Sequence, residues 1–191
     1  MVPRGVVLRI ASPLVRRGAA LSTCRRLREA TLNLPRVVDL NLSRSEDLVC
    51  KNMMCEKVGE VCVCKLAVWA SQSAPSLLNL ETLNLSQNGL TVLPDSIFEL
   101  TTVIKLDISE NKLTNIPDAI GRMTSLKYLD LYGNSDLEAL PVSLYDPCAS
   151  CLLDLNEIRL CREAGTRFEV AARESGWTVE STIEGEVVWK R

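Results

Sequence analysis

The feature that most constrains the fold of this chain is a repeat of 23 residues in its centre. Asn88, Asn111 and Asn134 stand at this spacing, and each follows an apolar triplet and precedes two apolar residues and a proline. The shared pattern is L-x-x-L-x-L-x-x-N-x-L-x-x-L-P, with one extra residue after Asn134. A period of roughly 20–50 residues is typical of solenoids, whose units bury their apolar residues only against neighbouring units.

Each part of the pattern has a structural consequence. The alternation L-x-L predicts a short strand with one buried face. The asparagine follows where the chain turns inward, and its amide can hydrogen-bond to backbone groups of adjacent coils. The proline disfavours a continued helix, so the return segment is predicted to be extended or irregular.

Residues 77–146 resemble the leucine-rich repeat family. The Leu-Pro ending and the repeat length are similar to the intracellular Ras-group-related and plant intracellular members. The resemblance implies an α/β solenoid, a leucine-rich repeat arc with a parallel concave β-sheet and an irregular or short-helical convex side. It also implies that Asn88, Asn111 and Asn134 form a structural ladder.

We predict three parts of the chain. A basic N-terminal segment precedes a solenoid of about six coils, and a C-terminal cap covers the last coil. These parts are residues 1–33, 34–156 and 157–191. The cap is expected to contain a helix, interrupted by Gly165, and a candidate hairpin around Glu184 and Gly185.

The repeats are strong over residues 77–146 and degenerate over 34–76 and 147–156. Val61 and Leu153 take the middle apolar position in two of the degenerate copies, and in the second copy Leu155 follows, with Ile158 in the asparagine position. Residues 49–70 are rich in Cys and Met. Residues 49–76 are therefore a true repeat, an insertion looped out of the solenoid or an error in the gene model.

The first 28 residues contain seven arginines, no lysine and no acidic residue. This composition is typical of a mitochondrial transit peptide. The alternative is a basic amphipathic helix that caps the solenoid, because Leu14, Leu21 and Leu27 fall roughly on one helical face. Contact of these arginines with RNA or anionic lipid is the less simple explanation, since no aromatic residues are interleaved with them.

Three aromatic residues near the C-terminus, Phe168, Trp177 and Trp189, are expected to pack against the last apolar coil. An aromatic binding box is their functional alternative. Only 4% of the chain is aromatic, so the rest of the core must be aliphatic.

The chain has 8 cysteines but no visible secretory signal, so disulfides are not expected. Two groups could supply thiolates to a metal ion: Cys50, Cys55, Cys62 and Cys64, and Cys148, Cys151 and Cys161. Cys148 and Cys151 also have the spacing of a redox pair. Neither group has the paired spacing of a zinc ribbon, so we interpret the cysteines as buried free thiols that act as small hydrophobes. No metal and no cofactor are expected.

Several function classes are disfavoured by what the sequence lacks. It contains no His, which excludes His-based catalytic triads and His-containing metal sites. No phosphate-binding or nucleophile-elbow motif occurs. The net charge of −2 gives no field for nucleic acid. No apolar run of about 18 residues occurs, so no transmembrane segment is expected.

The strand residues between the buried leucines are predicted to line the concave face. The candidate partner-binding residues are Thr82, Asn84, Lys105, Asp107, Tyr128, Asp130 and Tyr132. Tyrosine is a favoured interface anchor, and the acidic residues can pair with basic groups on a partner. An acid–base pair of Asp107 and Asp130 is disfavoured, because an open sheet encloses no substrate. We expect no catalytic residues.

The sequence therefore predicts a cytoplasmic, monomeric protein that binds a protein partner and is not an enzyme. The resemblance implies a signalling scaffold, with a small GTPase as one partner class. Two alternatives stay open. One is a mitochondrial assembly or accessory factor, and the other is a cysteine-based metal or redox protein.

Overall fold

The computed structural model describes residues 7–10, 37–45, 48–51, 53–57, 59, 61–73, 77, 79–145, 155–182 and 185–191. Across these residues the strands form a single sheet in the order β1-β2-β3-β4-β5-β6-β8-β7. The strands are β1 (Val7–Ile10), β2 (Val37–Asn41), β3 (Thr82–Asn84), β4 (Lys105–Asp107), β5 (Tyr128–Asp130), β6 (Glu157–Cys161), β7 (Thr178–Ser181) and β8 (Glu186–Lys190). From β2 to β6 all neighbours are parallel, whereas β1, β8 and β7 pair antiparallel at the two ends.

The middle leucines of the strong repeats hold the sheet in register. Leu83 of β3 pairs with Leu106 of β4, which pairs with Leu129 of β5. All three side chains are at most 1% exposed. Burying one leucine side chain stabilises the fold by about 1.5–3 kcal/mol, so the aligned leucines of adjacent coils form one continuous core.

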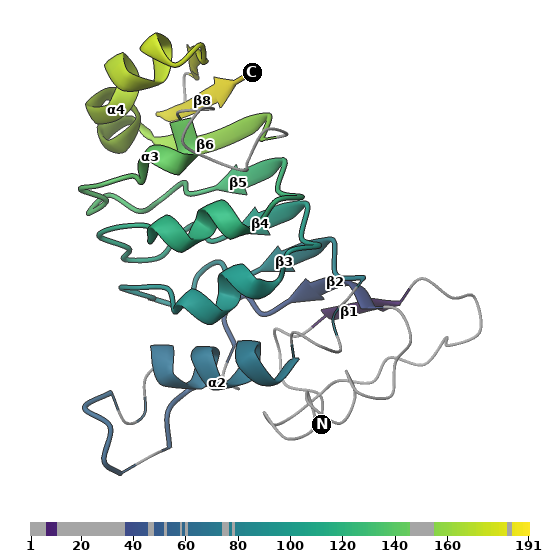
Figure 1. Ribbon diagram of the computed structural model, residues 1–191. Coiled ribbons are helices and arrows are strands. Elements are labelled where there is room, and N and C mark those ends of the chain that lie inside the picture. Colours follow the sequence, from purple (N-terminus) through teal and green to yellow (C-terminus); the bar gives the residue numbers. More distant parts are fainter. Residues whose placement is uncertain are drawn as a thin grey trace.

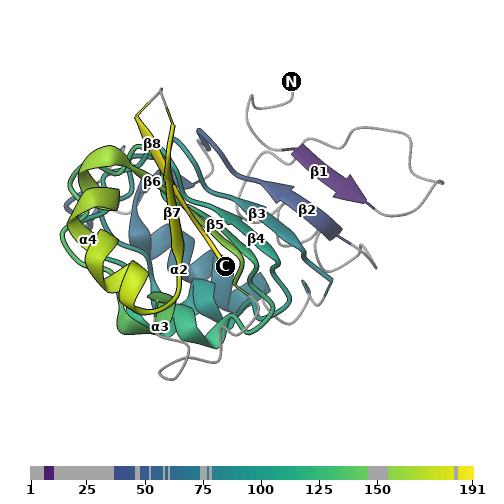
Figure 2. The same cartoon turned by 90° about the horizontal axis from the view of Figure 1, so that it is seen from above.

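Helices cover the convex side of the sheet, as Figures 1 and 2 show. They are α2 (Val63–Ser73), η3 (Asp95–Glu99), η4 (Asp118–Arg122), α3 (Val142–Tyr145) and α4 (Arg162–Glu174). Pro94 and Pro117 have extended backbone and immediately precede the 3₁₀ helices η3 and η4. The Leu-Pro step of each repeat thus ends the inner part of the coil and starts a single tight turn on the convex side.

The repeat asparagines connect neighbouring coils. Asn111 Oδ1 accepts hydrogen bonds from the backbone N–H groups of Asn88 and Leu90, both at 3.0 Å. Its Nδ2 donates to the carbonyls of Leu85 and Ile108 at 3.1 and 2.9 Å. Both polar atoms of this buried amide are therefore satisfied, by backbone groups of its own coil and of the coil before it.

Asn88 and Asn134 occupy the equivalent positions in the coils on either side. Asn88 Oδ1 accepts from the N–H of Ser45 at 2.8 Å, and Asn134 Oδ1 accepts from the N–H of Leu113 at 3.1 Å. The three side chains are at most 7% exposed. They form a ladder along the edge where each strand ends.

The N-terminal register differs from the one expected from the sequence. Leu40 of β2 pairs directly with Leu83 of β3, and Val61 lies outside the sheet in an isolated bridge with Val49. The intervening chain makes one long coil that contains α2. Leu66 and Trp69 of this helix are buried in the core, so a helix covers the convex side where a further repeat was predicted. Helical spacing of apolar residues decided the local structure here.

The C-terminal register also differs. Ile158 of β6, which was expected in the asparagine position, pairs with Leu129 of β5. Leu153 lies outside the described residues. Ile158 and Leu160 are buried and repeat the alternation of a strand, so they occupy the place assigned to Leu153 and Leu155. Five parallel strands, β2 to β6, are thus in register in the described part of the chain.

The C-terminal end of the arc is covered by α4 and by β8 and β7 (Figure 1). Helix α4 runs through Gly165 without interruption. Trp177 and Trp189 are buried with ring centroids 6.4 Å apart, and Phe168 packs partly buried against the same core. The Arg191 guanidinium lies 4.6 Å from the centre of the Trp177 ring. The aromatic residues therefore close the apolar end of the last coil.

Apart from β1, the N-terminal arginine-rich segment lies outside the described residues, and so does the choice between a cap helix and a transit peptide. In the part of the chain that the structure describes, no helix is long and apolar enough to cross a membrane.

Candidate functional site

The predicted partner-binding residues lie on β3, β4, β5 and the turns that follow them. Lys105 and Tyr128 are exposed, and Tyr128 is exposed by 42%. The remaining members of the set are partly buried: Thr82, Asn84, Asp107, Asp130 and Tyr132. The strand register aligns Thr82, Lys105 and Tyr128 in one row across the sheet.

A hollow of about 310 Å³ lies at the C-terminal half of this face. It is lined by Lys105, Tyr128, Leu129, Asp130, Glu157 and Arg159. The structure thus brings together three of the predicted residues, whereas Thr82, Asn84, Asp107 and Tyr132 lie outside this hollow. Tyr132 instead lines a second, shallower hollow of about 460 Å³ with Glu110 and Arg162.

Glu157 and Arg159 were missed at the sequence level. Both lie on β6, one residue on each side of Ile158. The sequence spacing aligned Leu153, and not Ile158, with Leu129. The two alignments differ by five residues, and a shift by an odd number of residues moves every side chain to the other face of the sheet. The signal that would have found them is the alternation Glu157-Ile158-Arg159-Leu160, which has the same form as Tyr128-Leu129-Asp130-Leu131.

Asp107 has a structural task at the end of its strand. Its Oδ1 accepts hydrogen bonds from the backbone N–H and the hydroxyl of Ser109, at 3.1 and 2.6 Å. Its Oδ2 accepts from Nδ2 of Asn84 at 3.1 Å. Short polar side chains commonly stabilise turns by bonding to backbone two residues ahead. Both carboxylate oxygens are therefore engaged within the protein.

Asp130 repeats this turn contact, because its Oδ1 accepts from the N–H of Tyr132 at 3.0 Å. Its Oδ2 lies 3.5 Å from Nη1 of Arg159, whose Nε lies 3.3 Å from carboxylate oxygens of both Glu157 and Glu186. Burial raises the pKa of Asp130 above its usual value, and neighbouring Asp107 adds to the rise, while the Tyr132 N–H and Arg159 oppose it. This site is thus a rigid, partly desolvated charge network.

The arrangement of Asp107 and Asp130 does not favour acid–base chemistry. They are register partners on adjacent strands, but each uses at least one oxygen to hold its own turn. The hollow beside Asp130 is an open part of the sheet face lined by charged and polar groups. Such a surface suits recognition of a partner rather than exclusion of water from a reacting bond.

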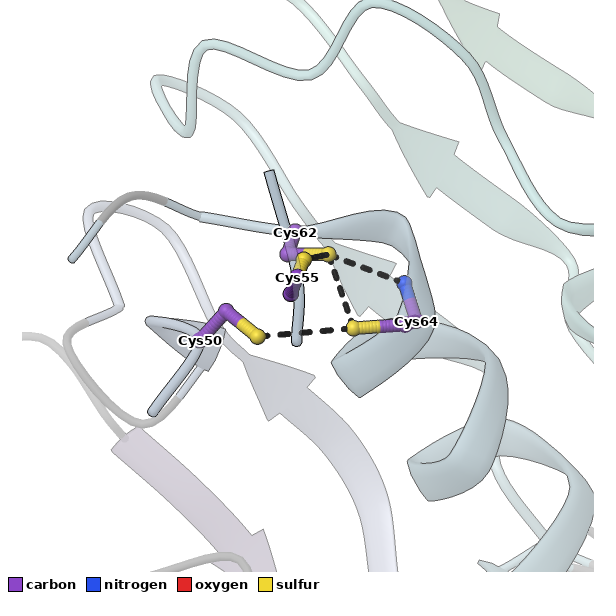
Figure 3. A group of neighbouring side chains, drawn as sticks. All are labelled: Cys50, Cys55, Cys62 and Cys64. Carbon is purple, nitrogen blue, oxygen red and sulfur yellow. Dashed lines mark hydrogen bonds between the residues drawn. The ribbon is translucent and has the colours of Figure 1, made fainter. Parts of the chain in front are cut away.

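The first cysteine group is brought together at the opposite end of the arc (Figure 3). The Sγ atoms of Cys50, Cys55, Cys62 and Cys64 all lie within 4.8 Å of one another. Cys50 and Cys62 are buried and Cys64 is exposed, so the expectation of buried small hydrophobes does not describe all four.

The four thiols interact electrostatically. Although burial opposes it, hydrogen bonds from Cys64 lower the pKa of Cys62 to about 7. The hydrogen bond with Cys62 raises the pKa of Cys64 to about 12. The second cysteine group is described only at Cys161, which is buried, because Cys148 and Cys151 lie outside the described residues.

Comparison with known proteins agrees with the geometry. Residues 79–135 match the family described as "Leucine rich repeat". Among curated proteins no sequence matches the chain. Solved structures that match include a leucine-rich repeat protein of Leptospira interrogans, with 21% identity and a TM-score of 0.45. The match covers 72% of this chain and 35% of that protein, so this chain spans about a third of its length. Residues 79–135 are leucine-rich repeats, and the parallel sheet with helices on its outer side is a leucine-rich repeat arc.

Proposed function

We propose that this protein is a non-catalytic binding module that docks a protein partner on its concave sheet. The observation that carries the proposal is the row formed by Lys105, Tyr128 and Glu157, three register-aligned side chains from adjacent strands. The row borders a hollow whose floor contains the Asp130–Arg159 ion pair. It combines one exposed aromatic ring with charges of both signs.

This combination has the properties of a protein-recognition surface. Tyrosine offers a large rigid area together with a hydroxyl, and it is enriched among the residues that dominate binding energies. Lys105 and Glu157 lie on either side of it and select a partner that presents an acidic and a basic group at matching positions. Because the floor is held by hydrogen bonds, little ordering is required when the partner binds.

The finer proposal is that the protein is a cytoplasmic, monomeric scaffold in small-GTPase-linked signalling. It is supported only by the resemblance to Ras-group-related repeats. Its test is the capture of purified small GTPases in their GDP-bound and GTP-bound forms by the intact chain. Binding of a GTPase in one nucleotide form and not in the other supports the proposal. If the chain captures neither the GDP-bound nor the GTP-bound form, the proposal is contradicted.

The arginine-rich start favours a second candidate, a mitochondrial accessory factor that binds its partner in the same way. Seven arginines without an acidic residue in the first 28 residues are the supporting observation. Mapping the N-terminus of the protein from cells by mass spectrometry decides between the two. A new start near residue 29 supports the mitochondrial candidate, and an intact Met1 or Val2 contradicts it.

The concave-face proposal is tested by proximity labelling in cells with the full-length chain and two variants, Tyr128→Ala and Lys105→Glu. The matched control is Lys112→Glu, a charge reversal at an exposed residue outside the strands. We expect both concave variants, but not the control, to lose the same set of labelled neighbours.

One such neighbour is then purified and its affinity measured directly. Loss of a tyrosine anchor is expected to weaken binding by at least about 2 kcal/mol, or roughly thirty-fold. Equal affinity of the wild type and both concave variants would sink the proposal.

A further inference from the structure

We propose that Cys50, Cys55, Cys62 and Cys64 form a structural binding site for one zinc ion. The four Sγ atoms lie within 4.8 Å of one another. The spacing of these cysteines in the sequence does not have the paired Cys-x-x-Cys form of a zinc ribbon. Cys50 follows the bridge between Val49 and Val61, and Cys62 and Cys64 lie at the start of α2. In Figure 3 the four side chains converge from these separate elements.

Two of the three hydrogen-bonded sulfur–sulfur separations are close to those around a single tetrahedral ion, and Cys62 and Cys64 would have to move apart by about 1 Å. With Zn–S bonds of about 2.3 Å, the sulfurs of a tetrahedral site lie about 3.8 Å apart. The observed separations are 3.6 Å for Cys50–Cys64, 3.4 Å for Cys55–Cys62 and 2.8 Å for Cys62–Cys64. Disulfides would join the sulfurs only in pairs, and an iron–sulfur cluster spreads its ligands over several irons. Four sulfurs around one point favour one ion.

Backbone groups also point at the sulfurs. The N–H of Cys64 donates to Cys62 Sγ at 3.4 Å, and the N–H of Lys57 hydrogen-bonds to Cys55. Both contacts join a cysteine to the residue two positions ahead. Donors of this kind orient thiolate ligands and offset their negative charge. Lys51, Lys57 and Lys65 follow the cysteines closely in the chain and offset the net negative charge of a zinc ion with four thiolates.

A cross-link would stabilise this segment, because its described residues bury little apolar surface. Met53 and Met54 are 86% and 92% exposed, whereas Cys50 and Cys62 at its two ends are buried. The backbone contacts that close the loop are Gly59 N–H to Cys50 carbonyl at 2.8 Å and Cys62 N–H to Leu48 carbonyl at 3.4 Å. Small structural units without a sufficient core are commonly held by a metal or disulfides.

A zinc ion here would fix the loop to the first turn of α2 and, through Lys57, to the first strong repeat. Lys57 Nζ donates to Thr91 Oγ1 at 3.1 Å. Binding converts the four thiols to thiolates and releases up to four protons to solvent, with no change in oxidation state. The ion therefore stabilises the N-terminal end of the arc and leaves the concave face unaltered.

The first test uses the wild-type chain, purified under reducing conditions without chelator. Mass spectrometry of the metals is expected to find close to one zinc per chain. After removal of zinc by a chelator, titration with Co²⁺ is expected to give the intense visible absorption of a tetrahedral thiolate site, and added zinc should bleach it. Absence of zinc together with no Co²⁺ spectrum would overturn the proposal. Iron with inorganic sulfide would also overturn it. So would an intact mass that shows two disulfides although the protein was purified with a reducing agent.

The second test locates the ion. The variant Cys62→Ser/Cys64→Ser is compared with Cys161→Ser, which replaces a buried cysteine whose Sγ donates to the carbonyl of Asn134 in another part of the fold. We expect the double variant to lose zinc and the control to keep it. Zinc retained in the double variant would assign the metal elsewhere and overturn the proposal. Should the double variant not fold, the Co²⁺ titration of Cys161→Ser decides, because a spectrum kept by this variant supports the first cysteine group and a lost spectrum overturns the proposal.

Discussion

Gly165 of α4 lies directly against Val187 of β8. A Cβ added to Gly165 would stand 2.5 Å from Val187 Cβ and within 2.8 Å of both its methyl groups. Non-bonded carbon atoms do not approach one another this closely, so the helix reaches the sheet only because residue 165 lacks a side chain. Glycine in a helix interior costs about 1 kcal/mol in propensity relative to alanine. The loss of helix propensity is offset by the close packing of α4 against β8, which joins the cap to the last coil.

We therefore expect Gly165→Ala to destabilise the protein although it raises helix propensity. Overpacking a core typically costs about 1–3 kcal/mol, and the propensity gain offsets less than half of the upper value. The free energy of unfolding from denaturant titration measures the net effect. In a double-mutant cycle, Gly165→Ala should cost less in the Val187→Ala background than in the wild type, because the two methyl groups are gone and only the Cβ contact at 2.5 Å remains. A more stable single variant would contradict the close approach.

The asparagine ladder predicts a large loss for Asn111→Ala. This variant removes the acceptor of two buried N–H groups in the coil before it, and the donor to the carbonyls of Leu85 in that coil and of Ile108 in its own. Each buried group left without a partner costs about 1–3 kcal/mol, so a total of about 2–5 kcal/mol is expected. Exposed Asn115→Ala is the matched control and should change the free energy of unfolding by less than about 0.5 kcal/mol. Similar losses in the two variants would contradict the ladder.

The raised pKa of Asp130 leads us to expect a change in the free energy of unfolding with pH. Its folded pKa is raised, so between about pH 3.8 and that folded pKa the folded chain binds more protons than the unfolded chain. The wild type should therefore lose stability relative to Asp130→Asn as the pH rises through this window, with a constant difference above it. Unfolding free energies of both proteins between about pH 3 and 7 provide the comparison. Parallel pH profiles would show that burial does not act on this carboxyl.

The contacts of Asp107 lead us to expect that a side-chain oxygen at this position contributes more to stability than the negative charge does. Asp107→Asn retains the Oδ1 that accepts from Ser109, whereas Asp107→Ala and a charge reversal to Lys remove it. We expect Ala and Lys to lower the free energy of unfolding by about 1 kcal/mol each and Asn to be nearly neutral. Thermal unfolding in moderate salt is a sufficient measurement. Equal stability of Asn and Ala variants would contradict the role of the turn contact.

The same contact changes how the concave face is tested. Reversing the charge of Asp107 and Asp130 looks like a surface change from the sequence alone. In the structure it also removes turn contacts to Ser109 and Tyr132. Tyr128 and Lys105 point from the same strands without such contacts in the hydrogen-bond network described above, so they separate binding from folding more cleanly.

The repeat itself was fully determined by the sequence. A fixed period with leucines at alternating positions leaves a stacked parallel sheet as the arrangement that buries every unit. Leu83, Leu106 and Leu129 accordingly lie in register, and Asn111 finds its backbone partners in its own coil and in the coil before it. These contacts repeat locally, so the pattern that predicts one of them predicts them all.

Only the tertiary structure decided what happens where the period fails. At the C-terminal end, Ile158 takes the place expected for Leu153, which adds Glu157 and Arg159 to the concave face. At the N-terminal end, α2 replaces a predicted strand and brings four cysteine sulfurs together. Degenerate apolar spacing is compatible with more than one register. The choice among registers depends on burial against elements distant in the sequence, so the local spacing of apolar residues did not decide it.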